Sequence, residues 1–214
     1  MLGAVLEDGR ERGANLRVVR GGPAADGAEL DALRRRDPVA VGALFDRHAR
    51  RIERLLLNVL GPDPDLPDLV QQTFLGVLAS LPSFRGDAAS FVPWLQRVAV
   101  FTARKHIRRR RARRWLRFGA PEELPELPEP AAGPELRAAA ARAYRLMERM
   151  PTEERLAFGL RFIEQLELVE VAEAMQTSLA TAKRRIAAAR GRFVEQARRD
   201  PLLAPWIREE TDGT

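Results

Sequence analysis

The 214-residue sequence contains no cysteine and only two histidines. Without cysteine there is no disulfide framework, no thiolate metal site and no cysteine nucleophile. His48 and His106 are 58 residues apart, and neither occurs in the HExxH spacing of a zinc enzyme. The sequence also lacks a Gly-rich phosphate loop. We therefore predict that the protein is not an enzyme and has no catalytic residue, metal site or cofactor.

Long apolar runs are missing as well. No stretch approaches the roughly 18 apolar residues that a membrane span needs, and the first residues lack the sustained apolar core of a secretory signal. We expect a soluble, cytoplasmic protein without membrane insertion. An alternative is a membrane-surface helix at 104–118, where Trp115, Leu116 and Phe118 accompany basic residues.

Charge is distributed in blocks along the chain. The net charge is +6 although 30 acidic residues are present. Residues 104–117 hold nine Lys/Arg and no acid, 119–135 hold five Glu, five Pro and no base, and 183–199 hold seven Lys/Arg and one Glu. This pattern is typical of two phosphate-binding modules on a tether, and it indicates nucleic acid as the anionic partner.

Apolar residues recur at intervals of three and four, whereas no segment alternates with a period of two. The pattern predicts an all-α protein. In the first half, helices are expected over 41–59, over 66–81 and from about 89 into the arginine run. His48 lies on the apolar face of the first helix and is expected to be a core residue with its hydrogen bonds satisfied. His106 lies among basic residues and is expected to meet phosphate or solvent.

In the second half, helices are expected from about 135 to 149 and from 152 to 163, with a break at 150–152. Thr152 is a candidate N-cap, with Glu153 and Glu154 in the first turn, where the helix dipole favours acids. Two short helices follow, over 168–175 and 179–193. The three residues between them fit the tight turn of a helix-turn-helix, and Ser178 can cap the second helix.

These patterns predict two small helical domains joined by a flexible, acidic, Pro-rich linker, the second containing the helix-turn-helix. The expected division is a disordered lead at 1–29, a first domain at 30–117, the linker at 118–135, a second domain at 136–200 and a tail at 201–214. The apolar residues of the tail are either a docking patch or a cap on the last domain; they are Leu202, Leu203, Trp206 and Ile207.

The second helix of a helix-turn-helix enters the major groove with its early outward residues. Here Lys183, Arg184, Ala187 and Arg190 lie off the apolar stripe, and the two early basic residues can donate to guanine edges or phosphates. Short helix pairs with a basic face also occur in all-α proteins that do not bind DNA.

The first basic region follows three aromatic residues: Phe84, Phe91 and Trp94. Single-stranded DNA needs rings on which bases stack and cations that follow the backbone. Phe91 and Trp94 lie on the apolar stripe and are expected in the core, so Phe84, in a loop, is the freer candidate for stacking. The arginine run is either a solvated segment or, because its charges repel one another, a binding site for a polyanion.

Two motif sets resemble one family. The stretch 68–74, DLVQQTF, is similar to the D-L-V-Q-E-T-F signature of extracytoplasmic-function RNA polymerase sigma factors, and LPSFRG at 81–86 and Trp94-Leu95 follow at the expected distances. The stretch 170–186, EVAEAMQTSLATAKRRI, is similar to the family's E-I-A-E-A-L-G-I-S-x-G-T-V-K-S-R-L pattern. The resemblance covers about residues 30–117 and 136–200.

The resemblance implies a division of labour among three surfaces. One binds the clamp helices of the largest subunit of core RNA polymerase and comprises Asp65, Asp68, Leu69, Gln71 and Gln72. A second opens and holds the minus-ten promoter element and comprises Phe84, Arg85, Trp94, Arg97, Arg104, Lys105 and Arg108. A third reads the minus-thirty-five element and comprises Ser178, Thr181, Lys183, Arg184, Ala187 and Arg190. Members of the family are often held by an anti-sigma factor, although no residue here identifies one.

The sequence departs from the family pattern at the turn of the helix-turn-helix. Gln176 replaces the usual Gly and Thr177 the usual apolar residue, so this turn is either less tight or requires left-handed backbone geometry from Gln. Phe101 and Lys105 replace an Asn and an Asp that are common on the minus-ten helix, so promoter sequence does not carry over. The rival interpretation is a stand-alone helix-turn-helix regulator with a helical partner domain. The acidic linker is also a candidate to mask a basic surface in the free protein.

Overall fold

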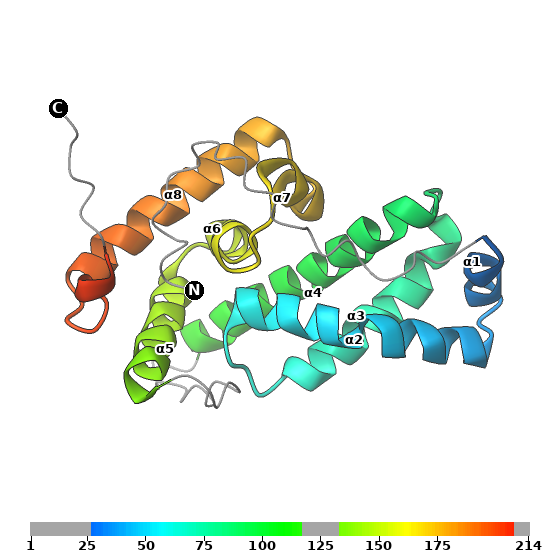
Figure 1. The fold of residues 1–214 in the computed structure, drawn as a ribbon, viewed down its shortest axis with the longest axis horizontal. Helices are drawn as coiled ribbons and strands as arrows, with labels where there is room; N and C mark the ends of the chain where they lie inside the picture. Colours follow the sequence, from blue (N-terminus) through cyan, green and yellow to red (C-terminus); the bar gives the residue numbers. More distant parts are fainter. Residues whose placement is uncertain (1–26, 117–132, 208–214) are drawn as a thin grey trace.

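The computed structural model describes residues 27–116 and 133–207, and in these ranges the chain forms helices and turns without strands (Figure 1). The all-α prediction is therefore confirmed for the described residues. We call α1 to α4 the first body and α5 to α8 the second body. The α-helices are α1 (Gly27–Arg34), α2 (Pro38–Leu60), α3 (Leu66–Ser80), α4 (Ala88–Leu116), α5 (Pro134–Arg149), α6 (Thr152–Phe158), α7 (Leu168–Met175) and α8 (Leu179–Arg198). Short turns of other helix types occupy Leu81–Ser83, Gly159–Ile163 and Ala204–Trp206.

The element bounds differ from expectation at the edges of the predicted domains. The helix α1 begins at Gly27, inside the expected lead, and α5 begins at Pro134, inside the expected linker. The rest of the lead and most of the linker, including its acidic segment, lie outside the described residues. The helix α1 has only two buried apolar residues, Leu30 and Leu33, which is too short a pattern to predict a helix from sequence.

Local capping explains where α2 begins and ends. The Asp37 carboxylate accepts hydrogen bonds from the backbone N–H groups of Val39 and Ala40, at 2.9 and 3.0 Å, and Pro38 occupies the first turn. The helix ends at Gly61, whose φ of 71° favours glycine. A side chain on Gly61 would also lie 2.8 Å from the Tyr144 ring, so two constraints fix glycine there.

The turn of the helix-turn-helix is formed by a left-handed residue followed by a serine cap. Gln176 adopts φ 53° and ψ 53°, the left-handed conformation, and its N–H bonds back to Ala172 and Glu173. Ser178 then caps α8, because its hydroxyl accepts a hydrogen bond from the N–H of Thr181 at 3.2 Å. Of the two alternatives for the turn, the structure shows left-handed geometry at Gln176, and it confirms the expected Ser178 cap.

One expected cap is wrong. Thr152 is the first residue of α6 rather than its N-cap, a position that Pro151 holds without a side-chain hydrogen bond. Met150 and Pro151, which follow α5, both have extended backbone geometry. The N-cap of α6 is therefore Pro151, one residue earlier than predicted. Glu153 and Glu154 do lie in the first turn.

The tail covers the core of the second body. Leu203 is fully buried and Ile207 nearly so, in a cluster with Phe158, Phe193 and other residues of α5, α6 and α8. Arg142 of α5 pairs with Asp200, which holds the chain where α8 ends. Residues 203 and 207 therefore form a cap, whereas Leu202 and Trp206 remain exposed.

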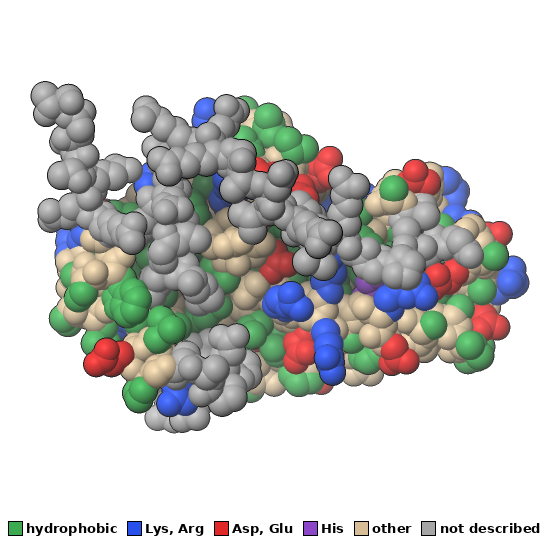
Figure 2. Space-filling view, in the orientation of Figure 1, with side chains coloured by type: hydrophobic (Ala, Val, Ile, Leu, Met, Phe, Trp, Pro, Cys, Tyr) green, Lys and Arg blue, Asp and Glu red, His purple; other side chains and the backbone are tan. Residues whose placement is uncertain are grey.

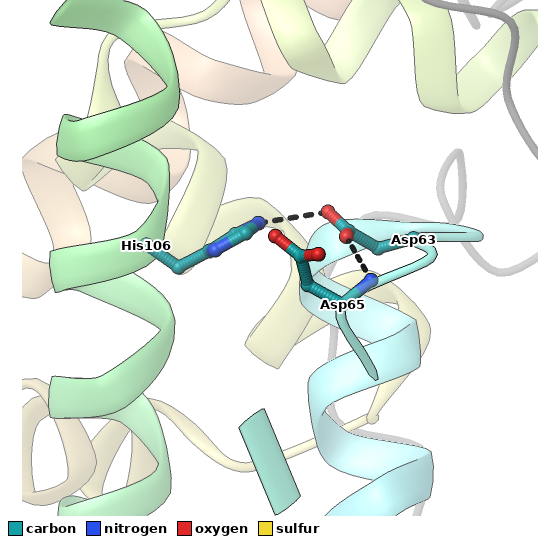
Figure 3. Close-up of side chains that lie close together, drawn as sticks. All are labelled: Asp63, Asp65 and His106. Carbon is teal, nitrogen blue, oxygen red and sulfur yellow. Dashed lines mark hydrogen bonds and ion pairs between the residues drawn. The ribbon is translucent and has the colours of Figure 1, made fainter. Parts of the chain in front are cut away.

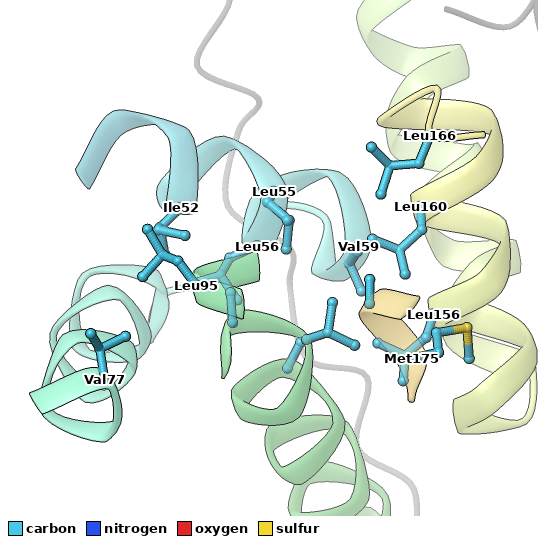
Figure 4. Packing of buried hydrophobic residues seen from close by; sticks show 14 of the residues in the cluster. Ile52, Leu55, Leu56, Val59, Val77, Leu95, Leu156, Leu160, Leu166 and Met175 are labelled. Carbon is cyan, nitrogen blue, oxygen red and sulfur yellow. The ribbon is translucent and has the colours of Figure 1, made fainter. Parts of the chain in front are cut away.

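The two bodies pack directly on each other through a shared apolar core. Val59 at the end of α2 lies with Leu156, Leu160 and Met175 of the second body in one continuous cluster (Figure 4). A side-chain carbon on Gly159 would lie only 2.9 Å from the Val59 Cα, so the backbones meet closely at this point. This direct contact was not predicted from the sequence.

A buried arginine of the second body completes the end of α2. Arg155 is 4% exposed; its Nε donates to the Val59 carbonyl at 3.1 Å and its Nη2 to the Leu60 carbonyl at 2.5 Å. The last carbonyls of a helix have no partner within the helix and carry its negative dipole end. The guanidinium therefore replaces water at α2 and fastens the two bodies together.

We expect Arg155→Met to separate the bodies, because it removes charged hydrogen bonds that no aliphatic side chain can replace. The loss should lower the free energy of unfolding by about 2 to 4 kcal/mol and increase the radius of gyration in small-angle scattering. Arg149→Met, at an exposed position on α5, is the control and should change neither quantity. An unchanged radius for Arg155→Met would contradict the role given to this residue.

His48 is buried as expected, at 3% exposure, but its Nε2 has no hydrogen-bond partner among the described residues. Burial lowers the pKa of His48 below 6.5, and the charges of Arg47 and Arg51 lower it further against the opposing effect of Glu29. The imidazole is therefore held neutral in the folded protein, and the unfolded chain binds the proton more readily.

This difference predicts a pH dependence with a definite sign. The contribution of His48 to stability is complete above about pH 6.5 and is lost as the pH falls below that value, by up to about 1.4 kcal/mol per pH unit. Denaturant unfolding at pH 7.5 and pH 5.5 should therefore show a smaller acid destabilisation for His48→Leu than for the native chain. Equal destabilisation of both would show that this histidine does not cause the effect.

Candidate polymerase and nucleic-acid interfaces

The helix α3 presents a polar row to solvent. Asp65, Asp68, Gln71 and Gln72 are exposed, as a docking surface requires. Leu69 is only 3% exposed and belongs to the core with Val70, Phe74 and Val77, so it is not available to a partner in this structure. Its place in the core follows from helical spacing, because Leu69 shares the buried face with Thr73 and Val77, four and eight residues later.

The exposed row includes a residue that the sequence analysis missed. Leu75 is 59% exposed and follows Asp68, Gln71 and Gln72 at the spacing that places residues on one helical face. The spacing alone could have identified it. An apolar side chain among polar ones is a common feature of the centre of a protein interface.

The loop before α4 contradicts the expectation that Phe84 is a free ring. Phe84 is 5% exposed, and its ring centroid lies 4.8 Å from that of Trp94 and 5.8 Å from that of Phe91. A side chain on Gly86 would collide with the Phe84 ring at 2.6 Å, so glycine allows the loop to fold over it. Trp94 is partly exposed and Arg85 exposed, and these two are the more accessible members of the group.

The basic residues on α4 are in different environments. Lys105 and Arg108 are exposed, and Arg97 and Arg104 are partly buried. Arg104 donates to the Met175 carbonyl at 3.1 Å and lies 3.0 Å from Glu153, measured from Nε to Oε1. Of the residues on α4 that are predicted to bind the minus-ten element, Arg104 therefore faces the second body.

His106 meets a carboxylate rather than phosphate or solvent. Its Nε2 lies 2.8 Å from Asp63 Oδ2 (Figure 3). The same oxygen also accepts from Arg110 Nη1 at 2.7 Å. The other Asp63 oxygen accepts from the N–H of Asp65 at 2.9 Å. Asp63 is buried, and this network fastens α4 to the start of α3.

The same cluster brings ligand atoms of Asp63, Asp65 and His106 within 4.8 Å of one another. A metal ion does not fit this arrangement, because the Arg110 guanidinium already shares Asp63 Oδ2 and would repel a cation. Burial by itself would raise the pKa of Asp63, but hydrogen bonds from His106 and from the N–H of Asp65, with the nearby charges of His106 and Arg110, lower it below 3.8. Asp63 is therefore a carboxylate that orders the loop before α3.

The outward face of α8 is open. Lys183, Arg184 and Ala187 are exposed, and Thr181 and Arg190 are partly exposed. The exposed Ser178 uses its hydroxyl in the helix cap and donates to Thr181 Oγ1 at 2.9 Å. All six residues predicted for the minus-thirty-five element therefore lie between the N-cap of α8 and Arg190, just past the middle of the helix. On the face drawn in Figure 2, basic and acidic side chains are interspersed where the described residues are visible.

This geometry defines a class: an all-α DNA-binding protein with a helix-turn-helix in one body and a basic helix in the other. The Sigma-70 region 2 family matches residues 44–113, and the Sigma-70 region 4 family matches residues 140–193. The first match covers α3 and most of α2 and α4, and the second contains the helix-turn-helix.

Relatives with similar sequences match this chain over most of its length. The ECF RNA polymerase sigma-E factor of Escherichia coli (strain K12) is 30% identical over 173 residues, which cover 75% of this chain and 88% of the relative. The RNA polymerase sigma factor NccH of Alcaligenes xylosoxydans xylosoxydans is 30% identical over 176 residues, covering 80% and 94%. The chain therefore belongs to the extracytoplasmic-function group of RNA polymerase sigma factors.

Two solved structures share the fold. CnrH, in complex with the cytosolic domain of CnrY, matches with a TM-score of 0.56 and 22% identity over 82% of this chain and 99% of that chain. The sigma factor RpoE in complex with the anti-sigma factor NepR from Bartonella quintana matches with a TM-score of 0.55 and 17% identity, over 74% and 97%.

Family membership defines the function in outline. The protein is a promoter-specificity subunit of RNA polymerase that directs transcription initiation. A stand-alone regulator is not favoured, because a helix-turn-helix protein of that kind would have no reason to match Sigma-70 region 2. Within the described residues, no helix combines the length and apolarity needed to cross a membrane.

Proposed function

We propose that three separate surfaces of this sigma factor carry its three contacts. The exposed row on α3 binds the clamp helices of core polymerase, α4 with the preceding loop holds the minus-ten element, and the start of α8 reads the minus-thirty-five element. The observation that carries this assignment is the open basic end of α8, where a left-handed turn and a serine cap present Lys183 and Arg184 outward.

The three contacts differ in their physical chemistry. The α3 row is polar with one apolar residue, which suits a protein surface. The α4 helix combines the partly exposed Trp94 with exposed Lys105 and Arg108, the pairing of ring and cation that unstacked bases require. The residues on α8 suit duplex DNA because an α-helix fits the major groove. The protein supplies binding and no chemistry of its own, and it acts in the cytoplasm with the polymerase.

An anti-sigma factor is a further proposed partner. The two solved structures with this fold are complexes, one with the cytosolic domain of CnrY and one with the anti-sigma factor NepR. The family connection supports a partner of this kind.

Arg184→Glu tests the assignment of α8. We expect it to weaken binding of the minus-thirty-five duplex about 10-fold to 100-fold, because it replaces a donor in the groove with a charge that repels phosphate. The affinity for core polymerase should stay the same. Footprinting of the polymerase complex should show loss of the upstream contact.

The control for this variant is Arg198→Glu, the same charge change about 21 Å further along α8. Arg198 is also exposed. An upstream footprint that Arg184→Glu leaves intact, or that both variants weaken equally, would contradict the assignment.

Asp68→Arg combined with Gln71→Ala tests the docking surface. Both side chains are exposed, so the fold should be preserved while the affinity for core polymerase falls at least 10-fold. Co-elution with core enzyme in size-exclusion chromatography measures the loss. Glu53→Arg, at an exposed position on α2, is the control. Co-elution of the double variant at the native level would show that α3 is not part of the interface with core polymerase.

A further inference from the structure

One carboxylate joins the two proposed DNA-binding helices. Glu153 Oε1 lies 3.0 Å from Arg104 Nε and 3.1 Å from Arg108 Nη2, both on α4. Glu153 Oε2 lies 3.2 Å from Arg185 Nη1 on α8. Glu153 stands in the first turn of α6, and its side chain is 24% exposed. Three arginines from the two bodies therefore meet at a single acidic side chain.

We propose that Glu153 occupies, in the free protein, an anion site that takes a backbone phosphate of DNA when the protein binds a promoter. The carboxylate thereby holds α4 and α8 together in a closed state that masks part of the DNA-binding surface. This inference rests on the proposed function of α4 and α8.

The charges support a phosphate as the competing ligand. The three guanidinium groups carry +3 and Glu153 carries −1, so the cluster retains a charge of +2. A phosphate offers an anionic centre with several acceptor oxygens, and arginine binds both carboxylate and phosphate through paired donors. A DNA duplex carries many phosphates, and counterions are released when the protein neutralises them. A single carboxylate releases no such counterions, so the duplex is the stronger competitor for the three arginines.

The distance between the two promoter elements is too long for the closed state to bind both of them. Elements centred about 25 base pairs apart are separated by roughly 85 Å along B-form DNA, at about 3.4 Å per base pair. Arg104 and Arg185 contact the same carboxylate, so their guanidinium groups lie within roughly 8 Å of each other. One protein can bind both elements only if the contact through Glu153 breaks and the bodies move apart.

Glu153→Gln tests the proposal, because it preserves the size of the side chain and removes its charge. The control is Glu154→Gln, which changes the net charge equally. Glu154 pairs with Arg192, at 2.7 Å, and this pair lies within the second body. The probe is a 60-base-pair duplex of mixed sequence, since contacts with phosphate do not depend on the target promoter.

Fluorescence anisotropy of the intact chain at several salt concentrations gives both affinity and salt dependence. We expect Glu153→Gln to raise the affinity at low salt about 5-fold to 10-fold over the control. The plot of log K against log salt should steepen by about 1 to 3 units, because up to three arginines become available to phosphate. Glu154→Gln should steepen it by no more than about 1 unit.

A second variant tests opening without a change of charge. Gly159→Leu places a side chain against the Val59 backbone and should wedge the bodies apart. It should raise both the radius of gyration and the affinity for the duplex. The proposal is overturned if Glu153→Gln matches Glu154→Gln in affinity and salt dependence. That result would contradict the proposal about Glu153 but not the proposed function. An unchanged upstream footprint for Arg184→Glu would instead contradict the proposed function.

Discussion

The buried guanidinium of Arg155 is the contact on which the arrangement of the two bodies depends. It supplies donors to the last carbonyls of α2, which a helix cannot satisfy by itself, and it does so from the other body. The surrounding leucines, valine and methionine exclude water from this contact. Two domains expected to be joined only by a flexible linker therefore share one apolar cluster, in addition to the separate cluster within the second body.

Closure divides the basic residues into two groups. Lys183 and Arg184 on α8 remain exposed, whereas Arg104 on α4 and Arg185 on α8 face Glu153. The blocks of opposite charge in the sequence thus have a structural counterpart: acidic residues of α6 offset basic residues of α4 and α8. In the proposed closed state, weak DNA binding by the free chain would limit its loss to the excess of nonspecific DNA.

Local features were predictable from the sequence, and long-range ones were not. The left-handed Gln176 and the Ser178 cap follow from residues within three positions of each other, so the helix-turn-helix could be recognised directly. The proposed docking surface on α3 came from the family resemblance, and helical spacing alone places Leu69 on the buried face. Phe84 was misjudged because a loop residue gives no periodic signal, and only the structure shows that it folds onto Trp94. Glu153 in the first turn of α6 and Arg155 in its last turn resemble ordinary helix residues. Nothing in their local sequence indicates partners about 50 to 95 residues away.

The most direct test of the closed arrangement is the distance between the two bodies. Because the chain has no cysteine, single cysteines at the exposed Ala43 and Glu195 can carry a pair of spin labels without background labelling. Pulsed dipolar spectroscopy should give one short, narrow distance distribution for the free protein. The distribution should shift to much longer distances in the complex with core polymerase and promoter DNA. The same distribution in both states would contradict the account, as would a broad, long distribution in the free protein.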